Sequence, residues 1–370
     1  MNEERRTSPV ELLWDLVFVF AVTQVTALIS HDLSWRGFGR GMLVLALMWW
    51  AWSAFVWAAN ATDPNGLTLR AALVLSLILI FITGLAVPHA FGDEATLFAL
   101  TYAGVRLVHL ALYADASRRG NASWAAIAGF GVTVLIGMAL LIVGSFFDGV
   151  VLALFWIAAA AIDYAGPAWL TRERLAGLQE VAVAHFAERY GLFIIICLGE
   201  SIVAIGVGAS ARPLDVALVA AIAISLLITV GMWWTYFDRF AADAEEQLRR
   251  HDNPVLAAAD GYSYIHLLLV AGIIVFAVGV KVAVAHVADP LGDAARLCLC
   301  GGVALYLAGH AAFRLRMTGR LELAKVAAAV GVMIVFAITG SAAAWVTALG
   351  VCVVLAVLTI REAAEVTSPA

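Results

Sequence analysis

An acidic residue stands deep inside a long apolar segment of this chain. The segment from His185 to Gly208, HFAERYGLFIIICLGESIVAIGVG, contains Glu188, Arg189 and Glu200. A charged side chain costs about 2.5–3.5 kcal/mol at the centre of a membrane helix on insertion scales. Glu188 and Arg189 lie near the start of the segment, where long side chains can reach water. Glu200 lies about 18 Å further along a helix, so it needs a partner, a proton or a water-filled cavity.

The positions around Glu200 favour a location that faces protein and not lipid. Glu188, Gly199 and Gly206 project to nearly one face of a helix, and Glu200 lies beside that face. Small residues on one stripe let another helix approach closely. Ionisable residues inside a membrane are usually functional, so we predict that Glu200, with the adjacent Ser201, couples the movement of an ion or proton. The structural alternative is a protonated glutamic acid bonded to a backbone carbonyl.

Other ionisable residues also fall inside apolar segments. Glu11 and Asp15 are four residues apart and Arg106 and His109 are three apart, so each pair shares a helix face. Because Arg106 and Glu200 both lie near mid-depth, we predict that they form the central pair. Acids and histidines at graded depth are what a proton path needs. We expect them in a cytoplasmic cluster made of Glu11, Asp15, Asp163, Glu188, Arg189 and His266.

Structural interpretations of this cluster remain open. Glu11, Asp15, Glu188 and Arg189 are equally compatible with snorkelling at the interface plus one salt bridge. For His266, a packing histidine with a satisfied hydrogen bond is favoured over a proton relay.

Composition places the chain in the membrane. Of its 370 residues, 64% are hydrophobic and 13% are charged, and the mean hydropathy is +0.96. Soluble domains have about 45–50% apolar and 25% charged residues. The apolar runs have helical length, which excludes a β-barrel with alternating strands. The lipid bilayer is therefore the expected environment, and no basic stripe indicates nucleic acid.

Motifs for cofactor or metal chemistry are missing from the sequence. The four cysteines fall inside apolar spans without a C-x-x-C pair, and neither H-E-x-x-H nor H-x-x-E-H is present. We therefore expect no metal site and no cofactor. The N-terminus, MNEERRTSPVELLWD, is a poor cleavable signal because Glu11 and Asp15 interrupt it, so the first helix should remain. The oligomeric state is open.

About twelve transmembrane helices are expected, each near the 20 residues that a bilayer core requires. The predicted spans are Val10–Ile29, Phe38–Ala59, Leu69–Val87, Thr96–Tyr113, Trp124–Ser145, Val150–Leu170, His185–Gly208, Val216–Phe237, Tyr262–His286, Ala294–Phe313, Leu323–Ile338 and Ala342–Ile360. The loop between the eighth and ninth spans, Asp238–Asp260, is long enough for a short surface helix.

The positive-inside rule orients these spans. About fifteen basic residues, from Arg5 and Arg6 to Arg361, fall on the side that holds both termini. The other side holds Arg36, Arg40, Arg212 and Arg296. Both termini are therefore predicted to be cytoplasmic.

A weak internal repeat divides the chain near its middle. Aligning Glu11 with Glu188 sets Gln24 opposite Ser201, beside Glu200, and makes Gln24 a candidate for the same site. The next helices share Met48-Trp49-Trp50 and Met232-Trp233-Trp234 in the same order. We therefore predict an all-α polytopic protein with two parallel six-helix repeats, residues 1–175 and 176–370. The alternative is that any two apolar helices look alike.

Two of these stretches resemble a known family. VELLWDLVFVFAVTQVTAL (Val10–Leu28) and ERYGLFIIICLGESIVAIGVG (Glu188–Gly208) resemble the bacterial low temperature requirement A (LtrA) family, and HLLLVAGIIVFAVGVK (His266–Lys281) resembles its third typical block. The resemblance covers nearly the whole chain. It implies a bacterial inner-membrane protein linked by name to growth in the cold, and it implies no substrate. By position, its motif residues are Glu11, Asp15, Glu188, Arg189, Gly199, Glu200, Ser201 and His266.

Three functions fit these residues. The first is a secondary transporter or channel for a small ion or solute, coupled to protons or cations through Glu200, with Arg106, His109, Ser201 and Gln24 nearby. The second is an intramembrane enzyme that acts on a lipid or small molecule, with the same acids as general acid and base. The third is a membrane sensor or scaffold without turnover. We predict the first.

Overall fold

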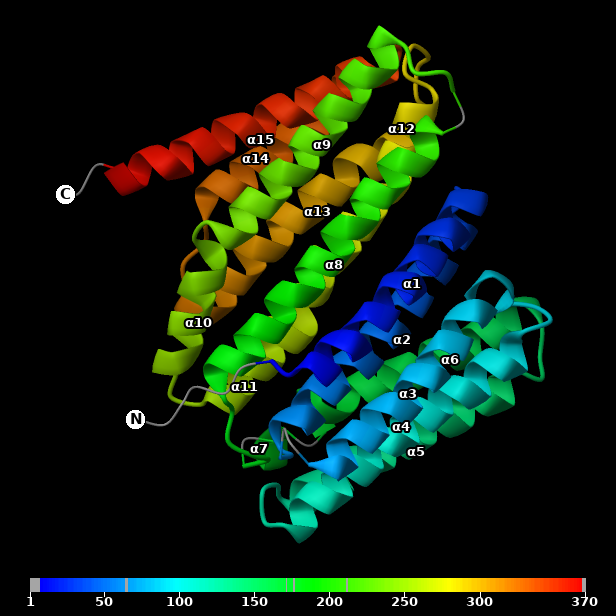
Figure 1. Ribbon diagram of the computed structural model, residues 1–370, viewed down its shortest axis with the longest axis vertical. Coiled ribbons are helices and arrows are strands. Elements are labelled where there is room, and N and C mark those ends of the chain that lie inside the picture. Colours follow the sequence, from blue (N-terminus) through cyan, green and yellow to red (C-terminus); the bar gives the residue numbers. More distant parts are fainter. Residues whose placement is uncertain (1–6, 64–65, 171, 176, 211, 368–370) are drawn as a thin grey trace. The chain divides into compact units, whose positions relative to one another are not determined.

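The described part of the chain is almost entirely helical (Figure 1). A computed structural model describes all residues except 1–6, 64–65, 171, 176, 211 and 368–370. Its elements are α1 Pro9–His31, α2 Trp35–Asn60, α3 Leu67–Ala86, η1 Val87–His89, α4 Ala95–Arg118, α5 Trp124–Gly144, α6 Gly149–Ala165, η2 Gly166–Leu170, α7 Arg172–Leu175, α8 Val183–Ala209, α9 Val216–Phe237, α10 Phe240–Arg250, α11 Pro254–Ala258, η3 Ala259–Ile265, α12 His266–Ala285, α13 Asp293–Thr318, α14 Leu323–Ile338 and α15 Ala344–Thr367.

The helix lengths match a bilayer. Among the described residues, 11 helices are long and apolar enough to cross a membrane, and α14 is a shorter apolar helix. Large apolar side chains remain exposed along these helices, including Leu154 at 58% and Ile338 at 73%. A soluble protein rarely exposes contiguous apolar surface of this extent, so these faces contact lipid. The chain is an all-α multi-pass membrane protein.

The spans begin and end where polar residues can cap them. The Glu11 side chain accepts the backbone N–H of Ser8 at the start of α1, and the Asp215 side chain accepts the backbone N–H of Leu218 at the start of α9. Such caps satisfy backbone donors that have no partner within the helix. The predicted surface helix between the eighth and ninth spans is present as α10, followed by α11.

The ninth predicted span begins in a different conformation from the one expected. Residues Ala259–Ile265 form the π-helix η3, and α12 starts only at His266. The end of the sixth span is also π-helical, in η2, where Pro167 follows Gly166. Proline cannot donate the next intrahelical hydrogen bond, which accounts for the loss of α-helical pairing at η2. Helices with π-turns often mark functional positions.

The chain divides into two compact units. The first comprises Met1–Tyr190 and Leu248–Tyr264, and the second comprises Gly191–Gln247 and Ile265–Ala370. In the first unit α1 packs on α2 and α3, α3 packs on α4, and α5 packs on α4 and α6. In the second, α12 packs on α13, α13 on α14, and α9 on α15. The predicted halves 1–175 and 176–370 are defined by sequence similarity and stay a prediction, and their boundary residue 176 lies outside the described residues.

Close helix packing in the second unit depends on glycines of α12 and α13. A Cβ at Gly302 would lie against the backbone nitrogen of Phe276 and 2.7 Å from the Gly272 carbonyl oxygen. Within the second unit a Cβ at Gly199 or at Gly206 meets no atom within 4 Å, so the predicted close approach of a helix at these two glycines stays a prediction. On α8 the close contact within this unit occurs at Gly208, against the carbonyl oxygen of Lys281.

Gly302→Ala should therefore destabilise the protein by about 1–3 kcal/mol, because the added methyl group overpacks the α12–α13 contact. Gly206→Ala is the matched control in the same unit, and it should be neutral or stabilising by up to about 1 kcal/mol. Thermal unfolding of both variants in detergent measures the difference. Equal melting temperatures for the two variants would contradict this packing.

Candidate functional site

Four buried ionisable side chains meet between the start of α1 and the start of α8. Arg189 donates hydrogen bonds from Nη1 to Glu11 Oε1 at 2.9 Å and from Nη2 to Asp15 Oδ1 at 2.6 Å. His185 Nε2 lies 3.2 Å from the same Glu11 oxygen. None of the four residues is more than 2% exposed. Each helix supplies two residues four positions apart, which puts them on one face. We call these residues, Glu11, Asp15, His185 and Arg189, the charge cluster.

The formal charges of the four cluster residues alone do not sum to zero. Two carboxylates face one guanidinium, so the cluster carries one negative charge while His185 is neutral. An uncompensated buried charge is costly. Asp15 Oδ2 and His185 Nδ1 are both buried without a hydrogen-bond partner among the described residues. One added proton would bring the formal charge of these four residues to zero.

Glu188 does not join the charge cluster. Its side chain is exposed, and its Oε2 accepts hydrogen bonds from Thr7 N at 3.1 Å and Thr7 Oγ1 at 2.8 Å. Arg189 is the next residue, about 100° around the helix, and points inward. The alternative of snorkelling plus one salt bridge is correct in its salt bridge, since Arg189 pairs with Glu11 and Asp15. Its snorkelling is wrong for these three residues, because all three are buried.

A second polar network follows the charge cluster along α8. The Tyr190 hydroxyl lies 2.7 Å from Ser53 Oγ and 3.1 Å from Ser263 Oγ. Ser53 Oγ donates to Ser263 Oγ at 2.9 Å, and the Trp57 indole donates to the same Ser263 oxygen at 2.8 Å. All of these side chains are buried. Ser53, Trp57 and Ser263 also line a cavity, so the network reaches its wall.

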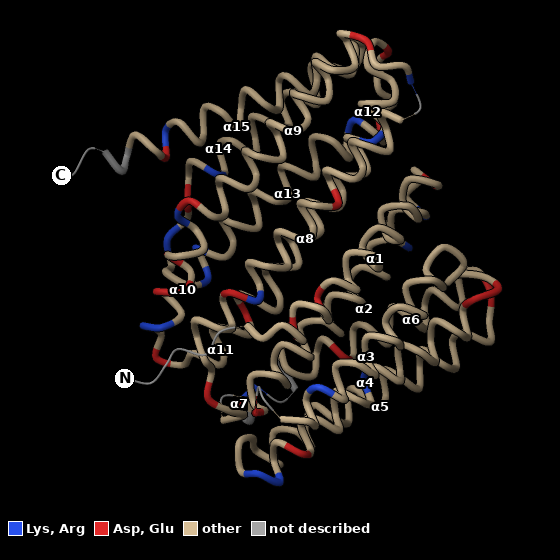
Figure 2. Tube along the Cα trace, viewed as in Figure 1, with Lys and Arg blue, Asp and Glu red and all other residues tan. Residues whose placement is uncertain are grey.

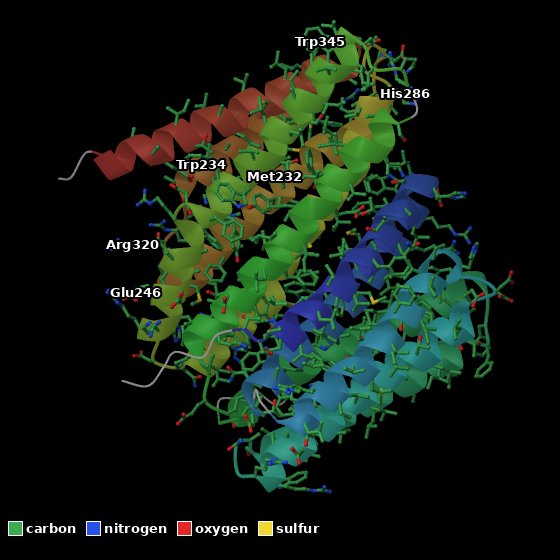
Figure 3. All side chains as sticks on the ribbon, viewed as in Figure 1. Met232, Trp234, Glu246, His286, Arg320 and Trp345 are labelled. Carbon is green, nitrogen blue, oxygen red and sulfur yellow. The ribbon has the colours of Figure 1, made fainter. Side chains whose placement is uncertain are left out.

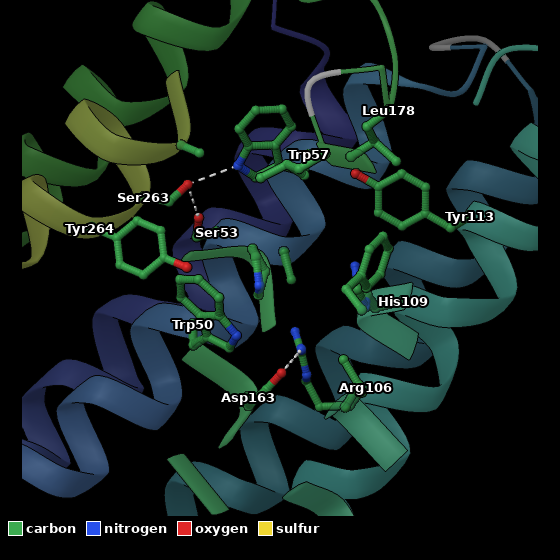
Figure 4. Close-up of a pocket in the computed structure, with 16 residues that line it drawn as sticks. Trp50, Ser53, Trp57, Arg106, His109, Tyr113, Asp163, Leu178, Ser263 and Tyr264 are labelled. Carbon is green, nitrogen blue, oxygen red and sulfur yellow. Dashed lines mark hydrogen bonds and ion pairs between the residues drawn. The ribbon is translucent and has the colours of Figure 1, made fainter. Parts of the chain in front are cut away.

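That cavity lies inside the first unit and measures about 60 Å³, which is room for a few water molecules. An ion pair forms one side of it, since Arg106 Nη2 donates to Asp163 Oδ1 at 2.8 Å. The close-up in Figure 4 places Trp50 and Tyr264 on one side of the cavity and His109 and Tyr113 on the other. We call this space the Arg106 cavity. Its lining residues are Trp50, Ser53, Ala54, Trp57, Arg106, His109, Tyr113, Phe130, Val134, Asp163, Pro167, Leu175, Leu178, Ala259, Ser263 and Tyr264.

The Arg106 cavity offers more hydrogen-bonding groups than the protein uses. Arg106 Nε and Nη1 are buried and have no partner among the described residues, and the same holds for His109 Nδ1. Arg106 is 2% exposed and His109 is 3% exposed. A buried donor without a partner costs about 1–3 kcal/mol. The unused guanidinium donors suit a ligand or water that presents hydrogen-bond acceptors.

Both π-helical elements of the described chain contribute to the Arg106 cavity. Pro167 comes from η2, and Ser263 and Tyr264 come from η3. An ion pair fixes η3 to α7, because Arg172 Nη1 and Nη2 donate to the two Asp260 carboxylate oxygens at 2.8 and 2.6 Å. These hydrogen bonds raise the pKa of Arg172, so its guanidinium stays charged at neutral pH.

The second unit holds the other predicted site residues on α8 and α12. Glu200 is 2% exposed, and the adjacent Ser201 is fully buried, with no partner for its hydroxyl among the described residues. His266 is fully buried, and its Nε2 lies 3.0 Å from the Tyr236 hydroxyl. Gln24 lies on α1 in the first unit and is half-buried.

The structure therefore groups the predicted residues differently from the sequence. Within the first unit, Glu11, Asp15 and Arg189 of the expected cytoplasmic cluster meet in the charge cluster, whereas Asp163 lies in the Arg106 cavity. The membership of His266, which belongs to the second unit, stays a prediction. Within the first unit the partner of Arg106 is Asp163. The predicted pairing of Arg106 with Glu200, which belongs to the second unit, stays a prediction.

Several residues of these sites were not predicted. His185 carries a usable signal, because it stands four residues before Arg189, which matches the spacing of Glu11 and Asp15. The hydroxyl groups of Ser53, Tyr190 and Ser263 carry none, since single serines and tyrosines are common in membrane helices.

Comparisons with known proteins agree with the predicted family. The sequence profile of the bacterial low temperature requirement A protein (LtrA) matches residues 6–360. The uncharacterized protein RA0937 of Rhizobium meliloti (strain 1021) is 30% identical over 318 residues, which are 83% of this chain and 77% of that protein. No solved structure is significantly similar. Because the profile spans nearly the whole sequence, the chain belongs to the bacterial low temperature requirement A (LtrA) family of membrane proteins.

Proposed function

We propose that the protein is a secondary transporter or channel for a small ion or solute and that its transport is coupled to protons. The observation that carries this proposal is the Arg106 cavity, which holds a buried ion pair and unused hydrogen-bond donors among membrane-spanning helices. Transporters commonly bind their substrates at polar sites within the helix bundle. The unused donors of Arg106 favour a solute with acceptor atoms, such as a carboxylate or a small oxyanion.

The charge cluster supports proton coupling. It contains two carboxylates, one guanidinium and one imidazole, all buried, and it becomes neutral on binding one proton. Protonation would remove the excess negative charge and weaken the ion pair between Arg189 and Asp15. Such a group can favour one conformation when protonated and another when deprotonated.

Glu200 is the proposed coupling group of the second unit. Its carboxyl group is buried in α8, beside the Ser201 hydroxyl, which has no hydrogen-bond partner among the described residues. A hydroxyl without a partner at this depth suits a polar ligand or a transient hydrogen bond. Gln24 is a proposed site residue of the first unit.

The proposed repeats gain support from matching contacts inside the two units. Tyr102 of α4 donates a hydrogen bond to the carbonyl oxygen of Leu47, next to the first Met-Trp-Trp, at 3.0 Å. Tyr306 of α13 donates to the carbonyl oxygen of Met232, within the second Met-Trp-Trp, at 2.7 Å. The fourth and tenth spans therefore make the same type of bond to the second and eighth, as two six-helix repeats would.

The proposed orientation, with both termini in the cytoplasm, rests on the distribution of basic residues. Arg5 and Arg6, which contribute to that bias, lie outside the described residues. Figure 2 shows that other Lys and Arg residues gather around α10, close to the predicted cytoplasmic ends of the second unit's helices.

The two alternatives have weaker support. An intramembrane enzyme would use His109 or Asp163 as a base, and a base is usually oriented by a third group. His109 Nδ1 has no such partner within the described chain. A scaffold would not need a cavity bordered by unused donors.

Flux measurements on the full-length protein in liposomes test the proposal. Small carboxylates, inorganic anions and alkali cations would each be offered with and without an imposed pH gradient, while solute uptake and internal pH are followed. We expect uptake of an acceptor-bearing solute that depends on the gradient. Glu200→Gln should remove the pH dependence, whereas Arg119→Gln, an exposed change at the end of α4, should leave it unchanged.

Two results would contradict the proposal. Normal pH-dependent uptake by Glu200→Gln would remove Glu200 from the coupling role. Absence of flux for every solute class, with correctly folded protein in the liposomes, would favour the enzyme or the sensor.

A further inference from the structure

A basic pocket opens in the second unit, where α10 adjoins the ends of α13, α14 and α15. Its volume is about 340 Å³. Figure 3 labels Arg320 at this end of the unit, near α10. The lining residues are Thr235, Arg239, Phe240, Asp243, Ala244, Gln247, Phe313, Arg314, Arg320, Leu321, Glu322, Leu323, Ala324, Lys325, Arg361 and Glu362.

Positive charge exceeds negative charge in the basic pocket. Its five cationic side chains face three acidic ones, which leaves a formal excess of two positive charges. Two of the ion pairs between them are long. Arg314 Nη1 lies 3.8 Å from Glu322 Oε2, and Lys325 Nζ lies 3.7 Å from Glu362 Oε1. The acids therefore compensate the bases only in part, and an added anion would be attracted.

Lys325 gives the pocket a fixed, buried cation. It is 2% exposed. Its Nζ donates to the carbonyl oxygen of Thr235 at 3.2 Å and lies 5.5 Å from the centre of the Phe240 ring. An ammonium group has three N–H donors, and the described residues accept one hydrogen bond from it. A second donor faces Glu362 at 3.7 Å, which leaves one donor for a ligand.

Two further polar groups of the pocket lack partners. The Arg320 side chain is exposed and forms no ion pair with any described residue. Gln247 Oε1 is buried, and no described residue donates a hydrogen bond to it. A rotation of the Gln247 amide by half a turn exchanges its oxygen and its NH₂ group. Gln247 can therefore present either group to a ligand.

The rim of the pocket is apolar. Leu321 is 48% exposed and Leu323 is 71% exposed, and both line the pocket. A soluble anion gains nothing from such a rim, whereas an acyl chain can lie against it. Basic pockets at the cytoplasmic ends of membrane helices commonly bind anionic headgroups.

We propose that this basic pocket binds a phosphoryl anion and that an anionic phospholipid supplies it. Lys325 and Arg320 contact the phosphate oxygens, Gln247 hydrogen-bonds the polar headgroup, and Leu321 and Leu323 contact the first acyl carbons. This site is separate from the Arg106 cavity and does not depend on transport.

Native mass spectrometry of the full-length protein in detergent tests the site. Phosphatidylglycerol, its soluble headgroup glycerophosphoglycerol and inorganic phosphate would each be titrated. We expect bound phosphatidylglycerol, with the Kd raised about fivefold by Arg320→Gln, which removes one surface cation. Lys325→Met should raise it at least as much. Arg316→Gln, an exposed change on α13 outside the pocket lining, is the matched control and should bind like wild type.

The three ligands distinguish the source of the phosphoryl group. Inorganic phosphate or glycerophosphoglycerol could displace phosphatidylglycerol with a Kd equal to that of the lipid. This result would support the phosphoryl site and assign it to a soluble anion. Binding of phosphatidylglycerol alone would support the lipid. If Arg320→Gln, Lys325→Met and Arg316→Gln all bind phosphatidylglycerol with the wild-type Kd, the proposal is overturned. Arg320 is exposed, so its substitution does not threaten folding.

Discussion

Replacing Arg189 with methionine should lower the free energy of unfolding by about 3–5 kcal/mol, which is typical for removing one partner of a buried ion pair. The guanidinium contacts both Glu11 and Asp15, at 2.9 and 2.6 Å. Both carboxyl groups are at most 2% exposed. Without Arg189, Glu11 would lose a guanidinium partner, and Asp15 would have to take up a proton or remain as a buried charge without a cation beside it.

Reversible unfolding in mixed micelles measures this effect. Arg212→Met is the control, because Arg212 lies 3.9 Å from Asp215 in a partly exposed pair, and such pairs contribute about 0–1 kcal/mol. The triple variant Glu11→Gln, Asp15→Asn and Arg189→Met should recover part of the loss, since it leaves no buried charge. Similar losses for Arg189→Met and Arg212→Met would show that the charge cluster is not buried as described.

Replacing Arg106 with methionine should reduce solute flux by about 100-fold or more, because two unused donors and one charged hydrogen bond are lost and each charged bond contributes about 1.5–3 kcal/mol. The variant should also be less stable, because Asp163 would keep a buried carboxyl group without its partner at 2.8 Å. Flux in liposomes and thermal unfolding are measured on the same preparation.

A double variant separates binding from folding. Arg106→Met with Asp163→Leu removes both charges, and replacing a buried ion pair by apolar residues is often neutral for stability. It should therefore unfold near the wild-type temperature and still fail to carry the solute. A stable double variant with normal flux would show that the Arg106 cavity does not bind the solute.

The membrane fold was predictable because apolar length is a direct physical requirement of the bilayer. Each predicted span corresponds to a helix, and only Leu323–Ile338 is shorter than a usual span. The family was also predictable, since the acid-containing stretches around Glu11 and Glu200 are specific. The surface helix α10 follows from the charged composition of the loop that contains it.

The grouping of the site residues was harder to predict, because it depends on how each helix is rotated about its axis. Glu188 and Arg189 differ by about 100° around α8, and that single step puts one in solvent and the other in the charge cluster. In helices that are apolar on all sides, hydropathy does not indicate rotation. The sequence therefore favoured Glu200 as the ion-pair partner of Arg106. In the structure, helix packing within the first unit places Asp163 beside Arg106.

The π-helical turns and the position of the close helix contact could not be predicted from the sequence either. The π-helical turns η2 and η3 place Pro167, Ser263 and Tyr264 on the wall of the Arg106 cavity. Pro167 signals a break in helical pairing, but no residue of η3 signals a π-turn. Similarly, Gly199, Gly206 and Gly208 are equivalent as small residues, and only the neighbouring α12 selects Gly208 for the close contact.

Proton-driven solute uptake by wild type and Asp15→Asn tests the central claim most directly. Asparagine keeps the shape of Asp15 and removes the extra negative charge, so the charge cluster no longer needs a proton. Wild-type liposomes should accumulate solute when a pH gradient is imposed, and the internal pH should change with it. Asp15→Asn should equilibrate solute without accumulation and without that pH change. Equal gradient-driven accumulation by both proteins would contradict a proton-binding charge cluster.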